Sequence, residues 1–244
     1  MNTNSNTYTF IYAALLVIIV AAALAFVAGV LQPRQLSNIE TEKRLNILNS
    51  ALLTMDAAKA PNKNSYVASQ FEKYITNSYV VNYKGEVVGG DAFGTEMQQQ
   101  FELLKEKQKE RLRLPVFECT LDDGTLLYIV QCYGLGLWGP IWGYVALKDD
   151  CNTIYGAVID HKGETPGLGS EISTEKYRRQ FIGKTIFKDD KFVSIAVVKG
   201  GAKPGDKHAI DAVSGGTITS NALQSLLYMS LEAYIPFFET ITKP

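Results

Sequence analysis

The longest run of apolar residues lies near the N-terminus and extends from Phe10 to Leu31 without a charged side chain. With a rise of ~1.5 Å per residue, a helix over this run is long enough to cross a hydrocarbon core of about 30 Å. Tyr8 and Tyr12 stand where aromatic side chains meet a membrane interface, and Pro33 marks the expected end of the span. The pattern predicts an N-terminal tail and transmembrane anchor over residues 1–34.

A cleaved signal peptide is the alternative interpretation, because Ala23-Leu24-Ala25 has the small-x-small form of a cleavage site. The first nine residues contain no Lys or Arg, and the apolar run continues past that site, so we favour a retained anchor. Arg34, Lys43 and Arg44 follow the span, and the positive-inside rule taken alone would place the rest of the chain in the cytoplasm.

Beyond the anchor, apolar residues at helical spacing predict three amphipathic helices. The first leaves the membrane and spans Ser37 to Asp56, the second follows a capping box of Thr95 and Gln98, and the third begins near Ser220. The apolar positions that define them are Leu36, Ile39, Ile47, Leu48 and Leu52 in the first, Met97, Phe101, Leu104 and Leu112 in the second, and Leu223, Leu226, Leu227, Leu231 and Tyr234 in the third.

Shorter segments rich in β-branched and aromatic residues predict strands. The clearest is a hairpin of Pro115–Leu121 and Thr125–Cys132 around the turn Asp122-Asp123-Gly124. Hairpin-linked strands mixed with helices indicate the α+β class, with one soluble domain that has a mainly antiparallel sheet and packed helices. Further strands are expected at Tyr79–Tyr83, Val87–Val88, Trp142–Leu147, Thr153–Asp160 and Phe192–Val198.

Composition and charge exclude several classes of function. The 244 residues carry 24 Lys or Arg and 25 Asp or Glu, a net charge of −1, so no nucleic-acid partner is expected. Cys119, Cys132 and Cys151 show no C-x-x-C spacing and are interpreted as small buried apolar residues. Only His161 and His208 could join them as ligands, so no metal site is expected. No G-x-G-x-x-G joins a strand to a helix, which argues against a Rossmann site.

The segment D-A-V-S-G-G-T-I-T-S, from Asp211 to Ser220, places four hydroxyl side chains just before the last expected helix. The unpaired N–H groups and the dipole of a helix N-terminus favour a phosphate there. An ordinary glycine turn with Thr219 or Ser220 as the helix N-cap explains the same pattern without a ligand.

Two other segments are rich in glycine. The first, H-K-G-E-T-P-G-L-G from His161 to Gly169, is an irregular loop after a strand, where binding residues tend to lie, but a plain connection would look the same. Its His161 and Glu164 form a conceivable acid–base pair, with no nucleophile indicated. The second, Y-G-L-G-L-W-G from Tyr133 to Gly139, sets Trp138 at a strand end, either to stack on a planar ring or to close the core.

Taken in chain order, G-L-G-L-W-G, H-x-G-E-T-P-G-L-G and D-x-x-S-G-G-T-x-T-S resemble the covalent FMN-binding domain family of bacterial respiratory flavoproteins. That family includes the C subunit of the Na⁺-translocating NADH:quinone reductase and the G subunit of the Rnf complex. With the anchor, the resemblance covers essentially the whole chain, and the chain length and the region between Ser37 and Leu114 fit the reductase branch better than the Rnf branch. Residues 115–244 are then the expected FMN-binding domain, and residues 35–114 its juxtamembrane part.

The resemblance implies that a flavin transferase uses FAD to attach FMN, through its phosphate, to a threonine hydroxyl. Thr217 aligns with the acceptor, Asp211 with the start of the pattern that the transferase recognises, and Gly216 stands where the family usually has Ala. Thr219 is cast as a phosphate contact or helix cap. The other implied cofactor-binding residues are Ser214 and Gly215 near Thr217, and Trp138, Glu164, Thr165, Gly167 and Leu168 around the isoalloxazine ring and ribityl chain.

The resemblance further implies an electron-transfer subunit of an NADH:quinone reductase, without a complete active site of its own. Its partners would be the other membrane subunits and the flavin transferase, and electrons would pass towards quinone. The single uncharged span offers no path for Na⁺. The soluble domain would lie on the periplasmic side of the bacterial inner membrane, against the Lys/Arg count. The alternative from another class is a membrane-anchored, non-redox binding or scaffold module.

Overall fold

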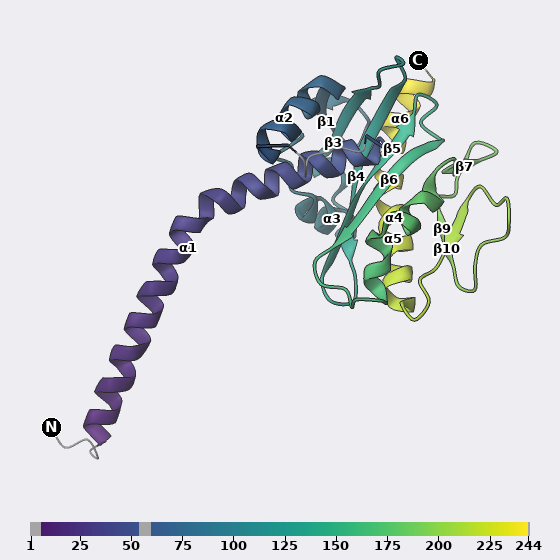
Figure 1. The fold of residues 1–244 in the computed structure, drawn as a ribbon. Helices are drawn as coiled ribbons and strands as arrows, with labels where there is room; N and C mark the ends of the chain where they lie inside the picture. The colour runs from purple at the N-terminus through teal and green to yellow at the C-terminus, as the bar shows by residue number, and fades with distance from the viewer. Residues whose placement is uncertain (1–5, 54–59, 244) are drawn as a thin grey trace. The chain divides into compact units, whose positions relative to one another are not determined.

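The computed structural model describes residues 6–53 and 60–243. The chain divides into two compact units, Met1–Lys43 and Arg44–Pro244. The described part of the first unit is helical throughout, because α1 begins at Asn6 and ends only at Ser50, within the second unit (Figure 1). By length and composition, α1 is a helix that could cross a membrane.

The expected break between the anchor and the following helix is wrong. Pro33 lies inside α1, so the two predicted helices are one. A proline removes one intrahelical hydrogen bond and disfavours helix at the preceding residue, but the flanking turns here continue the helix on both sides. The helix expected from Ser37 to Asp56 ends early, at Ser50, and Leu52 has a φ of 58°. The expected end at Asp56 lies outside the described residues.

The second unit is built on a six-stranded sheet in the order β2-β1-β3-β4-β5-β6, in which every neighbouring pair is antiparallel. The predicted α+β class with an antiparallel sheet is thereby confirmed. The strands of this sheet are β1 (Ile75–Val81), β2 (Val87–Val88), β3 (Leu114–Thr120), β4 (Leu126–Leu135), β5 (Pro140–Lys148) and β6 (Ile154–His161).

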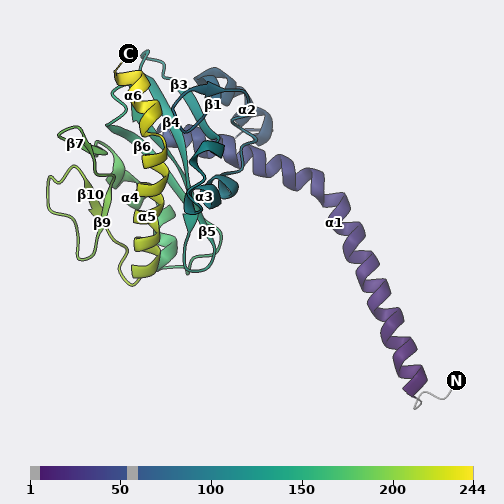
Figure 2. The ribbon, with the colours of Figure 1, turned by 180° about the vertical axis from the view of Figure 1, so that it is seen from behind.

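Strands β3, β4 and β5 are buried on both faces, which explains why they are almost continuously apolar. Along β4, Leu127 and Ile129 belong to one core cluster, whereas Val130 and Cys132 belong to the other. Helices α5 (Thr217–Ala233) and α6 (Ile235–Thr242) cover one face (Figure 2). The last turns of α1, with Ile47 and Leu48, and α2 (Lys63–Tyr74) belong to the cluster on the other.

Several other expectations are corrected. The helix α3 (Met97–Lys105) ends before Leu112. Its N-cap is Glu96 without a side-chain bond, and the Thr95 hydroxyl donates instead to the carbonyl of Asp91, so the expected capping box does not form. The expected strand Phe192–Val198 is interrupted at Ser194, whose φ of 58° is incompatible with extended backbone.

The second unit also contains several short elements, some of which border the candidate site. These are η2 (Lys109–Arg111), η3 (Gly169–Ser173), α4 (Glu175–Arg178), η4 (Arg179–Phe181), β7 (Phe187–Lys188), β8 (Lys191–Phe192), β9 (Ala196–Val198) and β10 (Ala209–Asp211). Strands β9 and β10 pair in parallel, and β7 pairs with β8.

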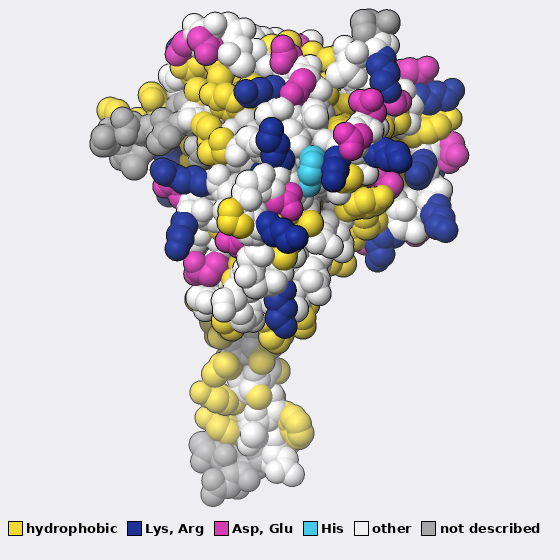
Figure 3. Space-filling model, turned by 90° about the vertical axis from the view of Figure 1, so that its right-hand side faces the viewer, with side chains coloured by type: hydrophobic (Ala, Val, Ile, Leu, Met, Phe, Trp, Pro, Cys, Tyr) yellow, Lys and Arg dark blue, Asp and Glu magenta, His cyan; other side chains and the backbone are white. Residues whose placement is uncertain are grey.

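The three cysteines are buried, as the sequence predicts, and in the structure all three thiols are free. Burial raises the pKa of each thiol to about 12, so all three stay protonated near neutral pH. On the surface, charged side chains of both signs are interspersed over the face shown in Figure 3, as expected from the small net charge.

Candidate functional site

The four hydroxyl side chains of the D-x-x-S-G-G-T-x-T-S segment lie in different environments at the start of α5. Ser214 and Thr217 are exposed, whereas Thr219 and Ser220 are each 2% exposed. Ser220 Oγ accepts the Val213 N–H at 3.0 Å, which closes the glycine turn onto the helix. Within residues 6–53 and 60–243, the Thr217 hydroxyl has no hydrogen-bond partner. The helix begins at Thr217, three residues earlier than predicted, with Gly216 as N-cap, so neither Thr219 nor Ser220 caps it.

Glu164 connects all three glycine-rich segments, although it is only 4% exposed. Its Oε2 accepts the Thr219 hydroxyl at 2.5 Å, and its Oε1 accepts the Trp138 N–H at 2.9 Å. Its own N–H donates to Nδ1 of His161 at 3.1 Å. Both carboxylate oxygens therefore accept hydrogen bonds from within the chain. Through these bonds Glu164, in the loop after β6, is linked to the β4–β5 turn and to the first turn of α5.

Two glycines make room for this carboxylate. A Cβ built on Gly136 would lie 2.5 Å from Oε1 of Glu164, and a Cβ on Gly169 would lie 2.6 Å from Oε2 and 2.5 Å from the Thr219 hydroxyl. Any side chain at either position would displace Glu164 from its partners. The glycines of these segments therefore serve close packing around a buried carboxylate as well as turn formation.

A hollow of about 260 Å³ lies against the first turn of α5, and we call it the inner hollow. Its walls come from the G-L-G-L-W-G, H-x-G-E-T-P-G-L-G and D-x-x-S-G-G-T-x-T-S segments. Seven of the residues proposed from the sequence line it: Glu164, Thr165, Leu168, Gly215, Gly216, Thr217 and Thr219. The remaining lining residues are Leu137, Gly169 and Ile218.

A second hollow of about 460 Å³ borders Thr217 from another direction, and we call it the outer hollow. Ser214 and Asp211 line it, together with Lys199, Gly200 and Gly201 from the turn after β9. Thr217 and Gly215 line both hollows. The hydroxyl of Thr217 is thus presented between two depressions of the surface.

The other proposed residues lie near the inner hollow or apart from it. Trp138 is 66% exposed, so its interpretation as a core residue is wrong, and only its backbone N–H contacts Glu164. Gly167 is exposed in the loop between β6 and η3. The Asp211 carboxylate accepts the Ala202 N–H at 2.8 Å, away from the inner hollow.

The sequence interpretation missed several lining residues. Leu137 and Ile218 are 48% and 57% exposed and line the inner hollow with Thr217, and both stand inside the quoted motifs without having been singled out. Lys199 and its two glycines precede the third motif by a stretch of irregular chain. The signal that could have found them is a basic residue followed by a glycine pair directly after a strand.

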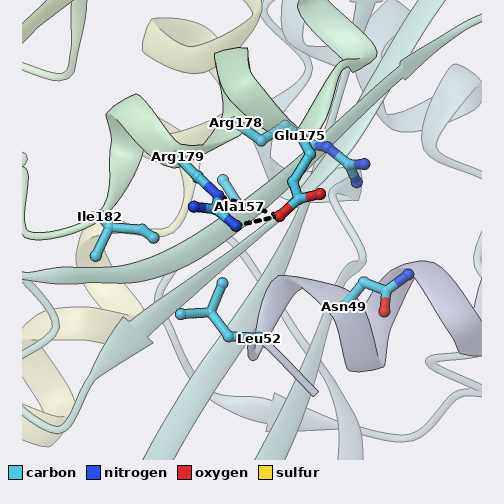
Figure 4. Close-up of a pocket in the computed structure, with 7 residues that line it drawn as sticks. All are labelled: Asn49, Leu52, Ala157, Glu175, Arg178, Arg179 and Ile182. Carbon is cyan, nitrogen blue, oxygen red and sulfur yellow. Dashed lines mark hydrogen bonds and ion pairs between the residues drawn. The ribbon is translucent and has the colours of Figure 1, made fainter. Parts of the chain in front are cut away.

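A separate cavity of about 390 Å³ lies between the end of α1, β6 and the α4–η4 segment (Figure 4). Arg179 and Glu175 form an ion pair there at 2.5 Å, and Nε of the neighbouring Arg178 is buried. None of the residues proposed from the sequence lines this cavity. Within residues 6–53 and 60–243, no group of three His, Cys, Asp or Glu side chains is placed to hold a metal ion.

Comparison with known proteins gives this site a class. Residues 136–232, which include Trp138, Glu164 and Thr217, match the family model of the FMN-binding domain. The second unit therefore contains an FMN-binding domain, which places the chain in the class of flavoproteins.

Full-length relatives narrow the class further. The C subunit of the Na⁺-translocating NADH-quinone reductase of Vibrio anguillarum is 31% identical over 84% of this chain and 85% of its own length. Its counterpart in Pasteurella multocida is 31% identical over 86% of both chains. The crystal structure of the C subunit from Parabacteroides distasonis superposes with a TM-score of 0.73, at 38% identity, over 85% of this chain and 96% of that one. The chain belongs to the family formed by the C subunits of Na⁺-translocating NADH-quinone reductases.

Proposed function

We propose that this chain is the electron-transfer subunit of a Na⁺-translocating NADH:quinone reductase and carries FMN in phosphoester linkage to Thr217. One observation supports Thr217 as the attachment residue: the four hydroxyl groups of the motif differ in exposure and in hydrogen bonding. Thr219 donates to buried Glu164 and Ser220 accepts from Val213, whereas Thr217 is exposed at the first position of α5 and borders both hollows.

The residues around Thr217 fit a bound FMN. The first N–H groups of α5 have no intrahelical acceptors and favour a phosphate on the Thr217 side chain. Leu137, Leu168 and Ile218 line the inner hollow with side chains that are 48%, 42% and 57% exposed, a costly arrangement unless a flat apolar group covers them. Trp138 is exposed on the same turn as Leu137 and offers a further face for the ring.

When bound, FMN supplies the electron transfer, and the chain supplies its position. Thr217 tethers the cofactor, so it cannot be lost to solvent. Glu164 keeps the turn that carries Trp138 against the turn that carries Thr217, through its two hydrogen bonds. None of these residues has to act as an acid, base or nucleophile during turnover.

The proposed cellular setting follows from α1 and from the family. The apolar part of α1 anchors the chain as a single-pass protein of a bacterial inner membrane, beside the other subunits of the complex. The soluble unit lies on the periplasmic side, where the flavin transferase modifies it. Electrons come from an upstream centre of the complex and continue towards quinone, while other subunits move Na⁺.

The experiment is flavin fluorescence of the full-length chain in a denaturing gel after co-expression with a flavin transferase. The wild-type band is expected to fluoresce, and Thr217→Val is expected to be dark because it lacks the acceptor oxygen. Thr165→Val is the matched control, since Thr165 is an exposed threonine of the same hollow outside the attachment motif. A dark wild-type band, beside a positive transferase control, would instead support a membrane-anchored module without a redox role.

A further inference from the structure

Lys199 lines the same hollow as Thr217, although it is outside the three glycine-rich motifs. It follows β9 directly and is exposed, and it lines the outer hollow together with Thr217 and Ser214. Among the described residues that line this hollow, Lys199 is the basic one. The hollow also contains the carboxylate of Asp211, so the arrangement of these two charges decides what the hollow can bind.

The Asp211 carboxylate is engaged in building the turn that carries Lys199. Its Oδ1 accepts the Ala202 N–H at 2.8 Å. In the parallel β9–β10 pair, Asp211 lies opposite Val198, whose carbonyl accepts the N–H groups of Gly201 and Ala212 at 3.2 and 3.0 Å. These hydrogen bonds fix the turn at both ends. The Lys199 side chain takes no part in them.

The turn itself requires glycine. Gly200 and Gly201 have φ values of 85° and 101°, in the region that side chains disfavour. A Cβ on Gly200 would meet nothing within 4 Å, so this glycine is not needed for close packing within the chain. The glycine pair is exposed, and its backbone lines the outer hollow, as Thr217 does.

We propose that Lys199 binds the phosphate through which FMN is joined to Thr217, and that Asp211 acts only by holding the turn. This inference rests on the proposed function. A phosphodiester carries one negative charge at neutral pH, and an ammonium group is a strong charge-assisted donor to such oxygens. The N-terminus of α5, which carries the positive end of the helix dipole, attracts the phosphate from the Thr217 side. The phosphate would then lie between this helix end and the ammonium group of Lys199.

The attachment step defines where this charge matters. The Oγ1–P bond to Thr217 forms, and the P–O bond that joins the FMN and AMP halves of FAD breaks. AMP leaves with the bridging oxygen, and the hydroxyl proton of Thr217 passes to a base of the transferase or to solvent. Lys199 stabilises the negative phosphoryl oxygens during this displacement and remains their partner in the product.

The test follows the rate of flavin attachment to the unlabelled full-length chain, using purified transferase and FAD, by fluorescence in denaturing gels. Lys199→Met is expected to lower the rate at saturating chain concentration by about tenfold, the loss of one charge-assisted contact. Lys199→Arg is expected to retain most of the rate. Lys203→Met is the matched control, because Lys203 is exposed just beyond the same turn and does not line the hollow.

The possible outcomes separate this inference from the proposed function. A wild-type rate for Lys199→Met would overturn it, and so would a defect confined to a higher KM for the chain, which would indicate docking of the transferase. An Arg variant as slow as the Met variant would show that the charge is irrelevant. Melting curves check the fold, with Lys199→Gln as the substitute if Met is not accommodated. A wild-type chain that takes up no flavin would overturn the proposed function itself, and this inference with it.

Discussion

At the scale of single residues, Glu164 is the group on which the candidate site is built. The sequence interpretation placed it beside the flavin as a contact. In the structure, its carboxylate accepts a hydroxyl and a backbone N–H from segments that are 55 and 26 positions away in the chain. Buried carboxylates are tolerated only when their oxygens are satisfied in this way. Its part is therefore to hold the two turns that present Thr217 and Trp138.

The close packing around Glu164 gives a prediction for Gly169→Ala. The added Cβ would lie 2.5 Å from the Thr219 hydroxyl and 2.6 Å from the Glu164 carboxylate, so we expect a loss of about 1–3 kcal/mol in the free energy of unfolding. Urea denaturation followed by circular dichroism measures it. Gly163→Ala is the control, because its Cβ would meet only the Trp138 carbonyl, at 3.9 Å, and equal midpoints for the two variants would contradict the packing argument.

At the scale of secondary-structure elements, the quality of the sequence predictions follows the range of the interactions involved. The hairpin of β3 and β4 was predicted well, because its turn is fixed locally: Gly124 N–H donates to the Leu121 carbonyl, and Asp123 accepts from Thr125. The strand expected at 192–198 is interrupted, because its first residue, Phe192, pairs with β7, whereas its last three residues pair with β10. A run of apolar residues does not show where the chain changes from one pairing partner to another.

The end of α1 gives a prediction at this scale. Ile47, Leu48 and Ala51 are at most 1% exposed and belong to the core on one face of the sheet. A chain that starts at Arg44 is expected to fold as the second unit does, whereas one that starts at residue 53 loses these side chains. Burial of two large aliphatic side chains stabilises by about 3–6 kcal/mol, a large part of a typical domain's stability.

The measurement is the urea midpoint of the two truncated chains under identical conditions. A further variant of the longer chain, Ile47→Ser with Leu48→Ser, separates the lost apolar contacts from the lost chain length. This variant is expected to match the shorter chain in its loss of stability. Equal midpoints for both truncations would show that the last turns of α1 add nothing to the fold.

At the scale of the whole molecule, the buried thiols make stability depend on alkaline pH. Burial raises the pKa of Cys119, Cys132 and Cys151 from 9.0 to about 12 in the folded chain. Between these values the unfolded chain loses thiol protons that the folded chain keeps. The stabilisation is therefore complete below pH 9 and is lost as the pH rises towards 12.

We accordingly expect the free energy of unfolding to fall when the pH is raised from about 8 to about 10, as measured by urea denaturation at each pH. The control is a triple variant with Ala at the three cysteine positions, which should show a shallower decline over this range. Buried tyrosines such as Tyr177, whose pKa is also raised by burial from 10.0, add to the decline only above that value. A pH-independent wild type would contradict the assignment of buried, protonated thiols.

The sequence by itself determined the apolar span, the α+β class, the hairpin and the family, because each depends on the composition or order of residues that are close in the chain. Only the structure shows that Pro33 lies within one helix. Only tertiary packing decides that Thr217 is presented while Thr219 is engaged by Glu164, and that Lys199 lines the same hollow as Thr217. Exposure of a hydroxyl and pairing of a carboxylate are set by contacts between distant segments. No local sequence pattern predicts this exposure or this pairing, because both are set only when α5 packs against the sheet.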